Sequence, residues 1–498
     1  MLRADNAEGV RQVFIQYTGE FNSGNGTQLS IDGDALASSD IFNEGNATDV
    51  VAHGTWSGSV DVDTEGKQIY GDLQLTQIDL IDTDVGLILN ASDADDSSLS
   101  ALVTGSGNLT LAGDLSISGG AANTYTGETA VTSGTVTLGM DSGFGNTSKL
   151  EIWSNAAVDL GAHSQTVGSL EIGNAQLDAE DAFRGTGTLT LAAGGTSEIW
   201  GTNNFSGTIV LGSGHDLALN NASGIGASAK VDFSAADSVL TIEGAESGVF
   251  GTELSGAGTV VISDSTIALS GGNTNFTGKW ELKSDAGVTV SDNVDAVLGT
   301  GADVALDGTL TLGFASSSAT DVTIDEKLSG SGSLVLTGAN NQKFGLAGSG
   351  SDFNGTVTLN QIGMTVGGSG TGANNAEAFK DADLVLQSGS VLEVATGSTV
   401  TTFDKVSVNN GQTAGFKFGG LGFNSDGTTA SGTSALVINE LVNNGAAQIA
   451  LDALGPNGDL LGAVAETSLV SGGVDVFQAL IQTGEVMDES ILNNFTLM

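Results

Sequence analysis

Short runs of alternating apolar and polar residues recur along most of the chain. Three examples are Thr135–Leu138, Thr208–Leu211 and Thr356–Leu359. In a β-strand this alternation turns one face toward a core and the other toward water. Glycine, asparagine, serine and threonine separate the runs, and these residues favour tight corners. The pattern therefore predicts many short strands joined by short corners.

A seven-residue element of the form Gly-X-Gly-X-apolar-X-apolar occurs four times. Successive copies are 80, 71 and 74 residues apart, a spacing typical of a repeat architecture. The copies begin at Gly105, Gly185, Gly256 and Gly330.

A second element, an aromatic residue followed two positions later by glycine, accompanies each copy. Its glycine lies 22, 22, 22 and 25 residues after the first glycine of the partner element. Because the aromatic residues recur in register, we expect them to pack in the core or at corners. They are Tyr125, Phe205, Phe276 and Phe353.

Each repeat of about 74 residues has room for about three coils of 20–25 residues. Short strands, short corners and a coil of this length predict an all-β fold, a parallel β-solenoid of roughly 20 coils. A sandwich or propeller fits less well, because it needs hairpin turns and has no such coil length. The single proline, Pro456, suits strands that are hydrogen-bonded along both edges.

The repeats predict three regions. Residues 96–439 form the repeat-bearing β-helix. Residues 1–95 form an N-terminal cap with the first coils, including strands at 13–15 and 72–75. Residues 440–498 form a C-terminal segment that departs from the pattern.

The charge of the chain excludes several classes of protein. The chain has 13 Lys and Arg residues against 59 Asp and Glu residues, a net charge of −46. A nucleic-acid partner needs a basic face, and an anionic membrane surface repels an acidic protein. The chain contains no cysteine, which rules out disulfides and zinc-thiolate sites. No apolar run is long enough for a membrane-spanning helix.

The segment Gly105–Leu138, with its Gly-X-Gly-X-Leu-X-Leu and aromatic-X-Gly elements, resembles the passenger repeat of autotransporters (type V secretion). The resemblance covers roughly residues 100–430. It implies a right-handed parallel β-helix exposed at the bacterial cell surface or released from it. It also implies a signal peptide and a C-terminal translocator β-barrel, and we expect both to be absent from this chain. The family includes adhesins, self-aggregating proteins, proteases and esterases.

Candidate catalytic residues are few, and we expect no enzymatic activity. Asp141-Ser142-Gly143 is similar to the surroundings of a nucleophilic serine, but His53, His163 and His215 lie in unrelated contexts. This segment is predicted to be a corner loop. A glycosidase needs two nearby carboxylates, and among 59 acids such a pair carries no information.

Two groups of residues could bind a ligand. Oxygen-rich clusters suit Ca²⁺, but neither cluster has the spacing of a complete calcium loop. We therefore expect solvated acidic loops and no cofactor, with Ca²⁺ as the one ligand that the clusters could bind. The four tryptophans are irregularly spaced, and exposed ones could stack on sugars or partners. The clusters are Asp79, Asp82 and Asp84, then Asp93, Asp95 and Asp96; the tryptophans are Trp56, Trp153, Trp200 and Trp280.

We therefore expect a cell-surface adhesin that binds through the long face of a β-helix. Its partner would be either a second copy on a neighbouring cell, giving aggregation or biofilm, or a host extracellular-matrix protein or glycan. Two alternatives stay open: a β-helical polysaccharide-degrading enzyme and a passive spacer that displays another domain. No motif assigns the binding residues or a metal site.

Overall fold

The computed structural model describes most of residues 97–394 and separate strands on either side. The described residues are 10–16, 42–43, 50–63, 68–84, 86–91, 97–244, 248–291, 294–314, 321–324, 326–338, 342–346, 352–366, 379–387, 389–394, 401–408, 413–418, 436–443, 448–453, 481–483 and 495–497.

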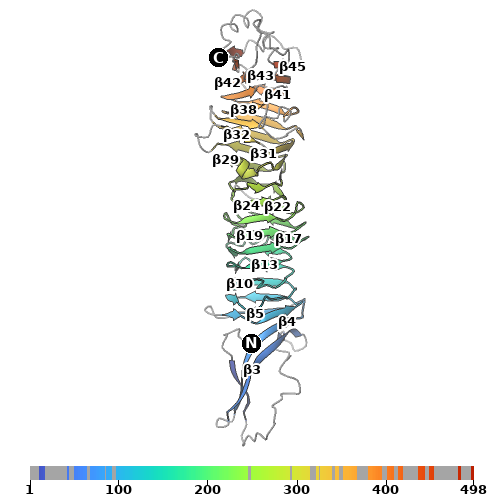
Figure 1. The fold of residues 1–498 in the computed structure, drawn as a ribbon, viewed down its shortest axis with the longest axis vertical. Helices are drawn as coiled ribbons and strands as arrows, with labels where there is room; N and C mark the ends of the chain where they lie inside the picture. The colour runs from blue at the N-terminus through green and yellow to red at the C-terminus, as the bar shows by residue number, and fades with distance from the viewer. Residues whose placement is uncertain are drawn as a thin grey trace, which may run out of the picture. The chain divides into compact units, whose positions relative to one another are not determined.

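The protein is all-β, and its parallel strands stack into a β-solenoid, as the repeats predict (Figure 1). Among the described residues the one helix is α1 (Val294–Leu298). No helix in this part of the chain is long and apolar enough to cross a membrane.

The predicted number of coils is wrong: the solenoid has about 13 turns rather than roughly 20. The prediction applied one coil length to nearly the whole chain. The strands nearest the N-terminus pair antiparallel instead of coiling. Coils also lengthen toward the C-terminus. Leu109 pairs with Thr129, one coil of 20 residues, whereas Leu451 pairs with Leu497, one coil of 46.

The chain divides into two compact units, Met1–Ser238 and Val239–Met498. In the first unit, an N-terminal antiparallel sheet joins the solenoid where β4 pairs in parallel with β7, and three parallel stacks follow. The antiparallel sheet contains β1 (Val10–Gln16), β2 (Phe42–Asn43), β3 (Val50–Asp63) and β4 (Gln68–Leu80), and β7 is Leu102–Gly105.

The first stack contains β5 (Leu87–Asn90), β8 (Leu109–Ala112), β10 (Thr129–Leu138), β11 (Leu150–Ile152), β14 (Leu170–Ile172), β17 (Thr196–Ile199) and β20 (Asp216–Leu219). The second contains β6 (Ser98–Leu99), β9 (Leu115–Ile117), the second half of β10, β12 (Ala156–Asp159), β15 (Phe183–Gly185) and β18 (Asn204–Phe205). The third contains β13 (Ser164–Val167), β16 (Thr188–Leu191), β19 (Thr208–Leu211) and β21 (Lys230–Phe233).

The second unit repeats this arrangement with three parallel stacks and one short strand pair. The first stack contains β22 (Val239–Glu243), β25 (Thr259–Ser263), β28 (Lys279–Leu282), β30 (Asp303–Leu306), β33 (Lys327–Gly330) and β36 (Asp352–Phe353). The second contains β23 (Gly248–Phe250), β26 (Thr266–Leu269), β29 (Gly287–Ser291), β31 (Thr309–Gly313), β34 (Ser333–Thr337), β37 (Thr356–Asn360), β39 (Asp383–Leu386), β41 (Thr401–Val408), β43 (Leu436–Asn443) and β45 (Ile481–Thr483). The third contains β32 (Asp321–Ile324), β35 (Lys343–Leu346), β38 (Gly363–Val366), β40 (Ser390–Val394), β42 (Thr413–Phe418), β44 (Gln448–Ala453) and β46 (Phe495–Leu497). The short pair is β24 (Glu253–Gly256) and β27 (Asn275–Phe276).

The inward side chains form the core, and the aromatic repeat belongs to it. Tyr125, Phe205, Phe276 and Phe353 are all at most 1% exposed, which confirms the prediction from their spacing. The Phe205 ring packs on Phe183 of the previous coil with 4.7 Å between centroids. Burial of these rings contributes to the hydrophobic stabilisation of each repeat.

The constant offset between the two glycine elements reflects stacking of consecutive coils. A Cβ atom on Gly207 would lie 2.0 Å from the carbonyl oxygen of Gly187 in the coil before it. The same 2.0 Å approach relates Gly278 to Gly258. Any side chain here would collide with backbone, so glycine is required at each of these corners.

Buried asparagines join the coils at the same corners. Asn203 accepts a hydrogen bond from the Phe183 backbone N–H (2.8 Å) and donates one to the Gly224 carbonyl (2.8 Å). One side chain thus bridges the coils before and after its own. Asn123 and Asn273 make equivalent pairs of bonds.

Candidate functional site

Three glutamates from consecutive coils form a row on the outer face of the first stack in the first unit. Strand register pairs Glu151 of β11 with Glu171 of β14, and Glu171 with Glu198 of β17. The strands are about 4.8 Å apart, so the carboxylates recur at that interval. Strand alternation places these glutamates outward because the flanking residues, such as Leu150 and Ile152, are buried.

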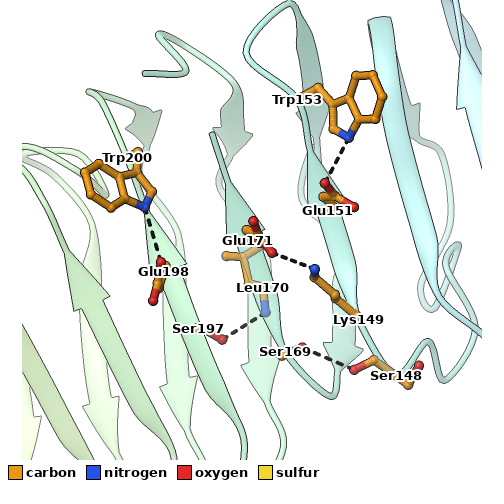
Figure 2. Close-up of polar contacts among 10 residues, drawn as sticks. All are labelled: Ser148, Lys149, Glu151, Trp153, Ser169, Leu170, Glu171, Ser197, Glu198 and Trp200. Carbon is orange, nitrogen blue, oxygen red and sulfur yellow. Dashed lines mark hydrogen bonds and ion pairs between the residues drawn. The ribbon is translucent and has the colours of Figure 1, made fainter. Parts of the chain in front are cut away.

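Each carboxylate in the row accepts a hydrogen bond from a different neighbour (Figure 2). The indole Nε1–H of Trp153 donates to Glu151 (3.0 Å). The Lys149 ammonium lies 2.6 Å from Glu171. These donors offset the repulsion that like charges produce when they lie opposite one another on neighbouring strands.

The third glutamate has the same kind of partner as the first. The indole Nε1–H of Trp200 donates to Glu198 (3.3 Å). Both indoles follow the last residue of their strand, so they lie on the same side of the row but beside its first and third glutamates (Figure 2). Their rings point away from each other, so they flank the three carboxylates.

A glycine separates the two tryptophans in the stacking direction. Backbone bonds run from Gly173 N–H to the Ile152 carbonyl (3.0 Å) and from Trp200 N–H to the Ile172 carbonyl (2.9 Å). Gly173 therefore occupies the position between the tryptophans. The chain folds back over it, since a Cβ there would lie 2.8 Å from the Leu177 carbonyl oxygen. We call Lys149, Glu151, Trp153, Glu171, Glu198 and Trp200 together the Glu–Trp face.

The Glu–Trp face is acidic and partly exposed: Trp153 and Glu198 are exposed, and its other four residues are half-buried. Trp153 is 49% exposed although every aromatic of the repeat is buried. Glu128 and Asp216 continue the acidic surface on the neighbouring coils. Partial burial acts to lower the pKa of Lys149. The hydrogen bond that Lys149 donates to Glu171 and the attraction of Glu171, Glu151 and Glu128 outweigh it, so this pKa is raised. The lysine stays charged and orders one carboxylate without neutralising the face.

Ser142 lies in a corner at φ 53°. Asp141 accepts a hydrogen bond from the Ser164 backbone N–H (2.9 Å), and its Oδ1 lies 3.3 Å from Nδ1 of His163. The Ser164 bond, followed by His163, lowers the pKa of Asp141. These contacts close the corner, and the neighbouring Ser142 hydroxyl has no histidine bond among the described contacts.

His215 and Ser197 form a hydrogen-bonded pair that is fully buried. The carbonyl of Ala192 can only accept, so His215 Nδ1–H donates to it (2.6 Å). Nε2 then accepts from the Ser197 hydroxyl (2.8 Å), whose oxygen accepts from the Leu170 N–H (2.9 Å). His215 is 0% exposed. A buried pair with every position satisfied joins three coils and cannot reach a substrate.

Residues of the first acidic cluster make hydrogen bonds within the protein. Asp79 accepts a hydrogen bond from Thr104, and Asp82 accepts one from the Asp84 N–H. No group of three or more metal-ligating side chains occurs in this part of the chain. The second predicted cluster, Asp93, Asp95 and Asp96, lies outside the described residues.

Trp280 and His53 do not extend the face. Trp280 is fully buried, and its Nε1–H donates to the Leu298 carbonyl (2.7 Å). His53 lies on β3 opposite Asp79. The side chain of Trp56 lies outside the described residues.

The three glutamates and Lys149 were not predicted as site residues, although the sequence contains a signal for them. The tripeptide Glu-Ile-Trp occurs at 151–153 and again at 198–200, and Leu-Glu-Ile occurs at 150–152 and 170–172. These repeated tripeptides place matching residues on successive coils once the coil lengths are known.

Comparisons with known proteins give two distant relatives from Escherichia coli (strain K12). The uncharacterized protein YuaQ is 29% identical over 180 residues, which are 32% of this chain and 13% of that protein. The uncharacterized lipoprotein YdeK is 30% identical over 258 residues, 48% of this chain and 18% of that protein. The matched part spans less than a fifth of either relative. No family model and no solved structure matches the chain.

Proposed function

We propose that this chain is the right-handed β-helical passenger of an autotransporter-type adhesin at the bacterial cell surface, without enzymatic activity. The observation that carries the proposal is the exposed Glu–Trp face. Tryptophan on a protein surface costs solubility, and tryptophan is enriched where proteins bind partners. A solenoid that only separated two other domains would gain nothing from an exposed Trp153.

Two further observations support this proposal. Parallel strands joined by crossovers in one sheet are right-handed in nearly all proteins, which favours a right-handed coil. The relative YdeK is named as a lipoprotein, which favours a location in the cell envelope.

Repetition would make such a surface effective. A single polar or stacking contact contributes little, but many copies on one cell multiply the avidity. The partner is either a second copy on another cell or a host matrix protein or glycan, and the net charge of −46 disfavours nucleic acid.

Glycan cleavage is the second candidate, because the row of carboxylates has a spacing that paired-carboxylate catalysis could use. A general acid needs an apolar site that keeps it protonated at neutral pH. Glu151 and Glu171 are only half-buried, Glu198 is exposed, and all three accept hydrogen bonds from N–H donors. These surroundings lack the apolar enclosure that a general acid needs, so the row suits binding better than catalysis.

The test is to display the chain on a bacterium that does not aggregate and to measure settling. Labelled expressing cells are mixed with unlabelled non-expressing cells, and adhesion to immobilised matrix proteins and glycans is measured in parallel. Clumps of expressing cells alone identify homotypic adhesion, and capture on a coated surface identifies a host ligand. If the displaying cells neither settle nor attach to a coated surface, the adhesin proposal is refuted and the spacer is favoured.

The display experiment needs a matched variant. Trp153→Ala with Trp200→Ala changes the Glu–Trp face, whereas Glu243→Gln with Asp303→Asn changes exposed carboxylates in the second unit. We expect adhesion to fall at least about threefold in the first variant and to persist in the second, because stacking contacts are each worth roughly 0.5–1 kcal/mol.

A further inference from the structure

We infer that the Glu–Trp face binds an extended polysaccharide of β-linked amino sugars that carry free amino groups. This inference rests on the proposed function and names the ligand class for the same surface. It follows from the charge of the face, the orientation of the two indoles and the spacing of the row.

The charge of the face selects a cationic or neutral occupant. Three carboxylates and one lysine leave the face negative, and Glu128 and Asp216 extend that charge. An acidic glycan or a phosphate-rich polymer would be repelled. A second copy using the same face is also disfavoured, because twofold pairing would place acidic row against acidic row.

The indoles present ring faces rather than donors. Both Nε1–H groups are already bonded to Glu151 and Glu198. These bonds fix the orientation of the rings, so the surface left for a ligand is the π face. The C–H side of a pyranose ring packs on such a face, and an ammonium group is attracted to it.

The spacing of the row favours a sugar polymer over a peptide. The carboxylates recur once per strand, every ~4.8 Å. Side chains on one side of an extended peptide recur every ~6.7 Å, so a basic peptide loses register within two or three coils. In an extended β-1,4-linked chain each sugar is turned over relative to the one before it. The amino groups of every second sugar therefore lie on one side, about two strand spacings apart, which matches Glu151 and Glu198. The outward-pointing rings then reach sugars beyond both ends of the row (Figure 2).

The experiment measures binding of the purified full chain to partly N-deacetylated chitosan oligosaccharides by calorimetry. Fully N-acetylated oligosaccharides, polygalacturonate and poly-L-arginine serve as comparison probes. We expect the partly deacetylated probe to bind best, with affinity falling as salt is added, and polygalacturonate not to bind.

Three variants locate the binding surface. Trp153→Ala with Trp200→Ala should weaken binding about tenfold, and Trp153→Phe with Trp200→Phe should retain part of it. Glu151→Gln, Glu171→Gln and Glu198→Gln together should weaken binding more than tenfold. The matched control Glu243→Gln, Asp303→Asn and Asp352→Asn removes three exposed charges elsewhere and should leave binding unchanged. Equal thermal midpoints verify that each variant is folded.

Several results would overturn the inference. If the glutamate variant and the charge control lose equal binding affinity, chitosan is attracted to any acidic surface of the protein rather than to the Glu–Trp face. Binding of poly-L-arginine but not chitosan, with the same dependence on the tryptophans, would assign the face to a basic polypeptide. Cells that settle or attach while the purified chain ignores chitosan would leave the adhesin proposal standing and refute only the ligand. If the purified chain binds chitosan but displaying cells do not adhere, the ligand inference stands and the adhesin proposal is refuted.

Discussion

At the scale of single residues, buried polar side chains join consecutive coils. His215, Ser197 and the Leu170 N–H form one chain of hydrogen bonds across three coils. Burial lowers the pKa of His215 despite opposing contributions from the Ala192 carbonyl and Asp216. The neutral imidazole is therefore the form that the fold requires.

This histidine predicts an acid-sensitive component of stability. Its folded-state pKa lies below the ordinary 6.5, so the unfolded chain takes up the proton first as the pH falls. The contribution is complete above pH 6.5 and decreases below it. We expect the midpoint temperature of thermal unfolding to decrease as the pH is lowered from about 7.5 to 5.5, a range above that in which carboxylates titrate. His215→Gln should be less stable, because it leaves buried partners unsatisfied at a cost of about 2 kcal/mol, and should show a smaller fall.

The control for this measurement is His163→Gln, which changes a half-buried histidine at a corner. It should keep the wild-type pH dependence. An unchanged pH dependence in His215→Gln would show that another group is responsible.

At the scale of elements, the corners determine how closely coils stack. The glycines of the two repeated elements lie one coil apart, and Gly207 has backbone where a Cβ would be. A strand propensity scale says nothing about this requirement, because it arises from the neighbouring coil.

Two alanine substitutions test the corner requirement. Gly207→Ala should destabilise the protein by about 3 kcal/mol, since the added Cβ would lie 2.0 Å from the Gly187 carbonyl oxygen. Gly120→Ala adds a methyl group at an exposed corner with nothing within 4 Å, so its effect should stay within about 0.5 kcal/mol. Thermal and denaturant unfolding measure both changes. If the two substitutions have similar effects, coil-to-coil packing is not the reason for the constant offset between the two glycine elements.

At the scale of the whole molecule, the negative net charge governs solubility and repulsion between and within copies. The net charge is −46 and the isoelectric point is about 4.1. Such a charge keeps the protein soluble and opposes contact between copies, while it weakens the folded state through self-repulsion.

Screening should therefore stabilise the protein. Raising NaCl from about 0.01 to 0.15 M shortens the screening length from roughly 30 to 8 Å, and we expect the thermal midpoint to rise by a few degrees. Solubility should be lowest near pH 4.1, where the net charge vanishes. A midpoint that falls on adding salt would mean that ion pairs such as Lys149–Glu171 outweigh the net repulsion.

Much of the fold was predictable because it depends on local chemistry. Alternation predicted the strands, glycine the corners, and the recurring Tyr125 and Phe205 the core. The coil count was wrong because coil length depends on loops and on antiparallel pairing near the N-terminus, neither of which follows from the repeat.

The sequence by itself determined that this protein is a β-solenoid with buried aromatic corners and an acidic surface, because alternation and glycine sterics act over a few residues. Only the tertiary structure decided that Glu151, Glu171 and Glu198 meet in one row between Trp153 and Trp200. The step from Glu151 to Glu171 is 20 residues and the step from Glu171 to Glu198 is 27, because the second coil includes the loop after Gly173. Side chains from coils of unequal length come into line only when backbone hydrogen bonds set the register between strands.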